Sequence, residues 1–168
     1  MAYDITRHTD VAAPGPNFDD FYRAHAGSIG RALEITLGDP ELAEDATNEA
    51  MARALQRWRR VSKYDNAPGW VYRVGLNWAL SWKRRRRRER ERPLAYTTST
   101  AGIELADDSL QMAVDGLSID HRAVVVCRYF LDWSTAQTAD ALHIAEGTVK
   151  SRLARALDAI RSELGETS

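Results

Sequence analysis

The chain has 168 residues, of which 44% are hydrophobic and 28% are charged, and its formal net charge is −1. This size and apolar content suit one ordinary domain or two small helical ones, and no apolar run approaches the length of a membrane span. The single cysteine, Cys127, excludes an internal disulfide and a cysteine-rich zinc site, and the N-terminus lacks the basic-then-apolar order of a signal peptide. We therefore expect a cytoplasmic protein without membrane insertion.

The charges are segregated along the chain. Residues 53–92 carry 14 Lys or Arg against three Asp or Glu, whereas residues 39–52 contain five acids and no base. Residues 104–115 contain four acids and no base. Such a distribution indicates that different surfaces meet partners of different kinds.

The first 16 residues contain two prolines and a glycine with little periodicity, and we predict a disordered tail there. From residue 18 onward, apolar or aromatic side chains recur at helical spacing, at Phe18, Phe21, Tyr22, His25, Ile29, Leu33 and Leu37. Gly38 ends this predicted helix, and Asp39 followed by Pro40 supplies the N-cap and first position of a second helix.

The second predicted helix has an apolar inner side and a charged outer side. The inner side comprises Leu42, Ala46, Ala50, Ala54, Leu55 and Trp58. The outer side is acidic at its start and basic at its end, a polarity that the helix dipole alone favours. The alternative interpretation is an acidic docking face for another protein.

A third helix is predicted from about residue 68 towards residue 92, after a loop over residues 63–69. We expect its core stripe to be Val71, Val74, Trp78 and Trp82. Six consecutive cations at residues 83–88 predict a polyanionic partner, because neutralising phosphates gives strong, salt-sensitive affinity. Aromatic rings beside cations can hold unstacked bases, and Tyr64 and Trp70 are better candidates for this role than Trp78 and Trp82.

The C-terminal part of the chain predicts a second helical unit. Residues 93–103 are polar, rich in Thr and without helical period, and we interpret them as a linker. Asp107 and Asp108 suit the start of a helix, and an apolar helix is expected from about residue 119 to residue 131, with Cys127 as a small core residue.

Residues 134–145 predict a short helix followed by a sharp turn. Ser134 with Gln137 three residues later is a capping-box pattern. The helix is expected to end near Leu142, with Ala136, Ala139 and Leu142 on its small or apolar face. Residues 143–145 leave a turn as short as a helix-turn-helix requires.

The next predicted helix, over residues 146–163, separates into two faces. Its buried stripe comprises Val149, Leu153, Ala156, Ile160 and Leu164. Its polar face comprises Thr148, Ser151, Arg152 and Arg155, with Lys150 flanking. Hydroxyls and cations on the first two turns are typical of a recognition helix, whose N-terminal residues reach base edges and phosphates. The alternative is the solvated face of an ordinary helical hairpin.

Together these elements predict an all-α fold. Two small helical domains, residues 17–92 and 104–168, are joined by a flexible linker over residues 93–103, and the C-terminal domain is a helix-turn-helix.

Segments of both predicted domains resemble bacterial sigma factors. The C-terminal domain contains GTVKSR, which is similar to the end of those proteins, and RAVVVCRYFLDWST, which is similar to the helix before their DNA-reading motif. The N-terminal domain contains ELAEDATNEAMARA, which resembles the segment that grips RNA polymerase, and PGWVYRVGLNWALSWKRRRRR, which resembles the promoter-opening helix. The order and size match the two-domain extracytoplasmic-function (ECF) group.

The resemblance implies a transcription initiation factor that binds core RNA polymerase and directs it to promoters. It implies contact with the clamp of the largest polymerase subunit by Glu44, Asp45, Asn48 and Glu49. It implies contact with the −10 element by Tyr64, Asp65, Asn66, Arg73, Asn77, Lys83 and Arg84. It implies reading of the −35 element by Thr148, Lys150, Ser151, Arg152 and Arg155. An anti-sigma factor is a candidate partner, and neither a cofactor nor a metal is implied.

Two other classes of protein are alternatives to this interpretation. A free-standing helix-turn-helix regulator would need dimerisation or ligand sensing in residues 18–92, which instead offer a basic and aromatic surface. An enzyme acting on nucleic acid would need a nucleophile or metal ligands. The four histidines are scattered, and no acids cluster with metal-ligand spacing, so we predict that the chain is not an enzyme.

Overall fold

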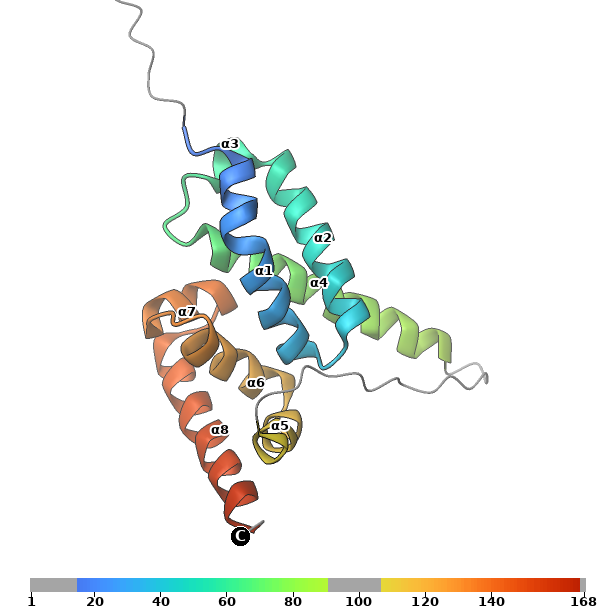
Figure 1. The fold of residues 1–168 in the computed structure, drawn as a ribbon, viewed down its shortest axis with the longest axis vertical. Coiled ribbons are helices and arrows are strands. Elements are labelled where there is room, and N and C mark those ends of the chain that lie inside the picture. The colour runs from blue at the N-terminus through green and yellow to red at the C-terminus, as the bar shows by residue number, and fades with distance from the viewer. Residues whose placement is uncertain (1–14, 91–106, 167–168) are drawn as a thin grey trace, which may run out of the picture.

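The computed structural model describes residues 15–90 and 107–166, and within them the chain is helical without strands (Figure 1). The predicted linker and all but the last two residues of the predicted tail lie outside the described residues. The N-terminal region contains α1 (Phe18–Leu37), α2 (Pro40–Gln56), α3 (Trp58–Val61) and α4 (Ala67–Arg90). The C-terminal region contains α5 (Asp108–Asp115), α6 (Ile119–Val125), the π-helical turn η1 (Val126–Phe130), α7 (Thr135–Leu142) and α8 (Glu146–Glu166).

The predicted boundary between the first two helices is confirmed. Gly38 has the left-handed φ of 64° that glycine tolerates, and its N–H donates to Glu34 O at 2.9 Å. Asp39 then caps α2 by accepting the N–H of Leu42 at 3.0 Å. Gly38 and Asp39 thus end one helix and begin the next within two residues. Helices α1 and α2 form an antiparallel pair whose apolar faces meet.

Helix α4 packs unusually closely against this pair. A Cβ added at Gly75 would lie 2.8 Å from Leu33 Cδ1 and 3.2 Å from the backbone oxygen of Ala46. The absence of a side chain at Gly75 therefore lets α4 cross both α1 and α2 at short distance.

The predicted core stripe of α4 is confirmed in part, and one detail of the predicted inner side of α2 is wrong. Val71 is fully buried, and Val74, Trp78 and Trp82 are half-buried and pack against the core. The other buried residues of α4 are Ala67, Gly69, Tyr72, Gly75, Leu76 and Ala79. Leu55 is not on the inner side of α2, since 56% of it is exposed, and Trp58 belongs to α3, where it packs against Phe18 and Phe21.

The C-terminal region follows its predicted local signals. Asp107 caps α5, and Ser134 and Gln137 form the reciprocal hydrogen bonds of a capping box at the start of α7. The apolar helix expected over residues 119–131 is α6 continued by η1. The expected apolar face of α7 is partly wrong, because Ala136 is exposed while Thr138 is buried. On α8, Val149, Ala156 and Ile160 are buried as expected, and Leu153 and Leu164 are half-buried.

The two regions pack against each other through a shared apolar core. Tyr72 of α4 is fully buried, and its ring meets that of Trp133 edge-on with 6.0 Å between centroids. Arg122 of α6 is buried as well and donates to Thr36 O of α1 at 3.2 Å. Its remaining hydrogen bonds go to the carbonyl oxygens of Val114, Asp115 and Leu117. The buried guanidinium of Arg122 is tolerated because all four of these hydrogen bonds go to backbone carbonyl oxygens.

Candidate nucleic-acid interface

The turn between α7 and α8 places the polar face of α8 outward. His143 ends α7 in the left-handed conformation, with φ 58° and ψ 43°, and its N–H donates to Asp140 O at 3.3 Å. Val149 is fully buried on the opposite side of α8, which fixes the rotation of the helix. As a result Lys150, Ser151 and Arg155 are exposed along its first three turns. This is the geometry in which a recognition helix enters the major groove of duplex DNA.

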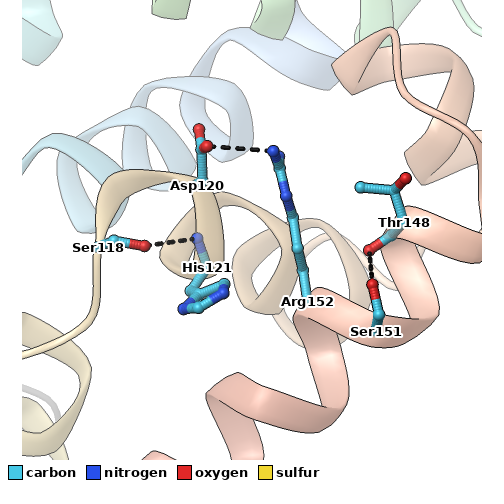
Figure 2. A network of polar contacts seen from close by, with 6 residues as sticks. All are labelled: Ser118, Asp120, His121, Thr148, Ser151 and Arg152. Carbon is cyan, nitrogen blue, oxygen red and sulfur yellow. Dashed lines mark hydrogen bonds and ion pairs between the residues drawn. The ribbon is translucent and has the colours of Figure 1, made fainter.

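The other two polar residues predicted on α8, Thr148 and Arg152, are only partly exposed (Figure 2). Arg152 lies across to α6, where its Nη2 forms an ion pair with Asp120 Oδ2 at 3.1 Å. Its side chain is only 28% exposed, whereas that of Asp120 is 67% exposed. Thr148 is half-buried, and its backbone oxygen accepts a hydrogen bond from Ser151 Oγ at 3.2 Å. The freely extended cations of this face are thus Lys150 and Arg155.

A cleft of about 690 Å³ gathers four of the residues predicted to contact the −10 element. Its N-terminal wall comprises Arg60, Tyr64, Asp65, Asn66, Trp70 and Arg73, and its other wall comprises Ala136, Gln137 and Asp140 of α7. The rings of Tyr64 and Trp70 are tilted, with 6.3 Å between centroids. Two rings and two guanidinium groups are of the kinds that hold unstacked bases and their phosphates.

Asn66 has a structural role in this wall. Its Oδ1 accepts the N–H of Gly69 at 2.9 Å, which satisfies one of the free donors at the start of α4. Its Nδ2 donates to Gln137 O of α7 at 3.3 Å, and only 8% of the residue is exposed. Asn66 therefore holds the loop and the helix start in shape from inside the wall.

The remaining residues predicted for the −10 element lie farther along α4. Asn77 is exposed, Lys83 donates from Nζ to Leu37 O at 3.3 Å, and Arg84 donates to Ser81 Oγ at 3.0 Å. The basic run continues over the exposed residues 84–90 at the end of α4, which projects beyond the neighbouring helices in Figure 1. There Arg86 lies over the ring of Trp82 at 4.8 Å. This end of α4 offers a dense row of cations to a polyanion.

The acidic face of α2 lies on a different surface. Glu44, Asp45 and Asn48 are exposed, and Glu49 is half-buried and paired with Arg53 at 2.7 Å. The first three side chains are therefore available to a partner, and the charge of Glu49 is partly compensated.

Sequence reasoning missed two classes of residue here. Arg60 lies on the cleft wall, although the sequence pattern assigned it only to the basic end of the second helix. Its position four residues before Tyr64 could have indicated that the two side chains share a surface. Asp120 and Arg122 were not singled out, because their partners lie 32 and 86 positions away along the chain. Within residues 15–90 and 107–166, no three His, Cys, Asp or Glu residues are arranged to hold a metal ion. No described helix is long and apolar enough to cross a membrane.

Comparison with known proteins agrees with this arrangement. Residues 21–89 match the family model for Sigma-70 region 2, and residues 107–160 match the model for Sigma-70, region 4. The chain is 37% identical over 158 residues to the ECF RNA polymerase sigma factor SigL of Mycobacterium tuberculosis, with 86% of this chain and 87% of that protein covered. It is 34% identical over 155 residues to the RNA polymerase sigma-E factor of Streptomyces coelicolor, with 88% and 85% covered.

Two solved structures share the fold. The sigma factor RpoE of Bartonella quintana, solved with the anti-sigma factor NepR, superposes with a TM-score of 0.73 at 23% identity, covering 88% of this chain and 96% of that one. CnrH, solved with the cytosolic domain of CnrY, gives a TM-score of 0.61 at 21% identity, covering 90% and 89%.

The chain belongs to the ECF sigma factors of bacterial RNA polymerase. It binds core RNA polymerase and promoter DNA and directs the polymerase to promoters, and the free-standing regulator is the wrong alternative. Sigma factors are initiation factors that contribute no catalytic group of their own to RNA synthesis.

Proposed function

We propose that each of the three polar surfaces has a separate role in transcription initiation. The exposed N-terminal half of α8 reads the −35 element, the cleft and outer face of α4 hold the melted −10 element, and the acidic face of α2 binds the clamp of the largest polymerase subunit. The units that carry these roles are residues 17–92 and 104–168. We also infer that the protein acts in the cytoplasm and is not itself an enzyme.

The observation that carries this division is the separation of cations and acids onto different helices. On α8, Arg155 is exposed and suits bidentate recognition of a guanine edge, while Lys150 suits a phosphate. Arg152 and Thr148 remain predicted contacts, and Arg152 must leave Asp120 before it reaches a base. On α2, Glu44 and Asp45 are exposed in a segment without a base before Arg53, which favours a basic protein surface over DNA.

An anti-sigma factor is a further proposed partner. The support is the fold shared with RpoE and CnrH, each of which was solved in a complex, with NepR and with CnrY respectively. Such a partner would act by covering one of the three surfaces above.

The test is transcription in a reconstituted system. Core polymerase with the wild-type chain should start RNA synthesis from particular members of a genomic promoter library, and core polymerase alone should not. Reversing both charges, with Glu44→Lys and Asp45→Lys, should abolish co-elution with core polymerase and promoter-specific RNA. The matched control reverses two exposed acids on the first turn of α1, Asp19→Lys and Asp20→Lys.

The control variant should retain co-elution. If the α2 variant also co-elutes and transcribes as the wild type does, the clamp assignment is wrong. If no template in the library responds to the wild-type chain, promoter selection itself is refuted.

A further inference from the structure

The ion pair between Arg152 and Asp120 joins the recognition helix to α6 (Figure 2). Arg152 belongs to the second turn of α8 and Asp120 to the first turn of α6, and 3.1 Å separate Nη2 from Oδ2. On α8, Arg152 lies three residues after the buried Val149 and three before the exposed Arg155. It therefore stands at the boundary between the buried stripe and the polar face, and its side chain extends across to α6.

The α6 end of this pair is a rigid anchor. Ser118 caps α6 by accepting the N–H of His121, the residue after Asp120, at 3.3 Å. Two residues after Asp120, the guanidinium of Arg122 is buried and donates to backbone oxygens on both α5 and α1. The backbone on either side of Asp120 is thus held, so Asp120 presents its carboxylate from a fixed backbone position.

The other contacts of α8 restrict its direction less. The turn over residues 143–145 determines where the helix begins. Val149 and Val124 of α6 belong to one apolar cluster, which determines the side of α8 that faces inward. Apolar attraction has no preferred direction, so it tolerates a small tilt of one helix on another. A charge-assisted hydrogen bond has a narrower range of favourable distances and angles, and the pair of Arg152 with Asp120 therefore restricts the tilt of α8 over α6.

The tilt of α8 matters because bidentate recognition of a base edge depends on the placement of the guanidinium. Arg155 lies nearly one turn beyond Arg152 and is exposed, so a tilt at Arg152 displaces Arg155 relative to the groove. We propose that Asp120 and Arg152 are a positioning pair, which sets the tilt of the recognition helix and so determines base preference at −35 through Arg155. The inference rests on the proposed −35 reading by α8, and it gives Arg152 an indirect part in that reading in place of the predicted direct contact.

The test breaks the pair and then rebuilds it in reverse. Asp120→Asn removes the carboxylate charge at an exposed position, and Arg152→Asp removes the guanidinium. Asp120→Arg combined with Arg152→Asp restores an ion pair whose two side chains have the same summed length. Asp108→Asn is the matched control for Asp120→Asn, because Asp108 is also an exposed acid on the first turn of a helix in the same region.

Each variant is assembled with core polymerase and tested on a promoter that the wild-type chain selects. Binding of the holoenzyme is measured on that promoter and on its single-base −35 variants, and discrimination is the ratio of the two affinities. This ratio cancels effects common to all templates, such as repulsion between phosphates and a new carboxylate. Urea unfolding of the full chain, followed by circular dichroism, separates a loss of stability from a loss of discrimination.

A positioning pair predicts that breaking it changes the same base preferences as Arg155→Ala does. Asp120→Asn and Arg152→Asp should each lower discrimination at those positions by about threefold or more, a part of what one bidentate contact supplies. Asp108→Asn should change discrimination by less than about twofold, because it lies outside the pair. The reversed pair should recover discrimination to within about twofold of the wild type, because the two substitutions act on one contact.

A direct base contact by Arg152 predicts a different pattern. Arg152→Asp would then remove discrimination that Asp120→Asn retains and the reversed pair does not restore, and this result overturns the inference. Unchanged discrimination in Asp120→Asn overturns it as well, whether or not the urea midpoint falls. If Arg155→Ala relaxes base preference in the same assay, the proposed reading by α8 stands and only the positioning pair is refuted. A wild-type holoenzyme without −35 preference refutes both.

Discussion

The buried hydroxyl of Tyr72 allows a sharp test of how α4 is fastened to α1. Its Oη lies 2.7 Å from Thr36 Oγ1, and Thr36 Oγ1 lies 2.8 Å from Ala32 O. A carbonyl oxygen cannot donate, so Thr36 uses its one proton on Ala32 O and Tyr72 must donate to Thr36. The two substitutions Tyr72→Phe and Thr36→Val therefore break the same hydrogen bond from opposite ends with different consequences.

Tyr72→Phe keeps the ring against Trp133 and leaves Thr36 its bond to Ala32, so no donor is orphaned. The expected loss in the free energy of unfolding is about 1 kcal/mol, the net value of one neutral hydrogen bond. Thr36→Val leaves the buried Tyr72 donor with only the weakly accepting sulfur of Cys127, so the expected loss is about 1–3 kcal/mol.

Urea unfolding followed by circular dichroism measures both losses, with unchanged m-values as the sign that the folded and unfolded states are otherwise alike. The double variant Thr36→Val with Tyr72→Phe should lose less than the sum of the single losses, because the orphaned donor is gone. A larger loss for Tyr72→Phe than for Thr36→Val would refute the assigned direction of the hydrogen bond, and no loss in either would refute its contribution to stability.

Two further predictions concern the recognition face and the buried thiol. Arg155→Ala should relax base preference at particular −35 positions by roughly 1–3 kcal/mol, whereas Lys150→Ala should weaken binding to all promoters alike and reduce the slope of log affinity against log salt concentration by about one unit. The measurement is the affinity for single-base −35 variants at several salt concentrations. Uniform weakening by Arg155→Ala would contradict base reading. Burial raises the pKa of Cys127 from 9.0 to about 12, so the stability that its neutral form contributes is complete below about pH 9 and is lost as the pH rises towards 12. Between pH 9 and about pH 12, the urea midpoint should fall less steeply with pH for Cys127→Ala than for the wild type. Parallel curves for the two proteins would show that ionisation of this thiol does not cause the loss of stability.

Local signals in the sequence predicted the ends of helices better than their rotation. Gly38, Asp39 and the Ser134–Gln137 capping box act within one helical turn, so their partners are readable from spacing alone. The buried surface of α4 was predicted only in part, because this helix is covered on two sides, by α1 and α2 and by the C-terminal region. A single-stripe pattern then selects the large Trp78 over the small Gly75, although Gly75 is buried where a Cβ would clash with Leu33 of α1.

One wall of the cleft was predictable from the sequence, but the opposite wall on α7 was not. Tyr64, Asp65, Asn66 and Arg73 were expected to act together, and one cleft contains all four. The groups on α7 that accept hydrogen bonds from this wall are mainly backbone oxygens, which every residue possesses and which leave no trace in the sequence. The ion pair of Arg152 with Asp120 is equally invisible, because it depends on how α6 and α8 cross.

The C-terminal end of α1 is held by contacts from both regions of the chain. No basic residue occupies the last turn of α1, and its final carbonyl groups are served from elsewhere, by the N–H of Gly38, by Lys83 and by Arg122. Only Arg122 belongs to the C-terminal region, so α1 depends on that region for the partner of one carbonyl oxygen, that of Thr36. The other two contacts, including a cation that offsets the negative end of the helix, come from the N-terminal region. The end of α1 is therefore held mainly by its own region, and Arg122 adds the one contact that comes from the C-terminal region.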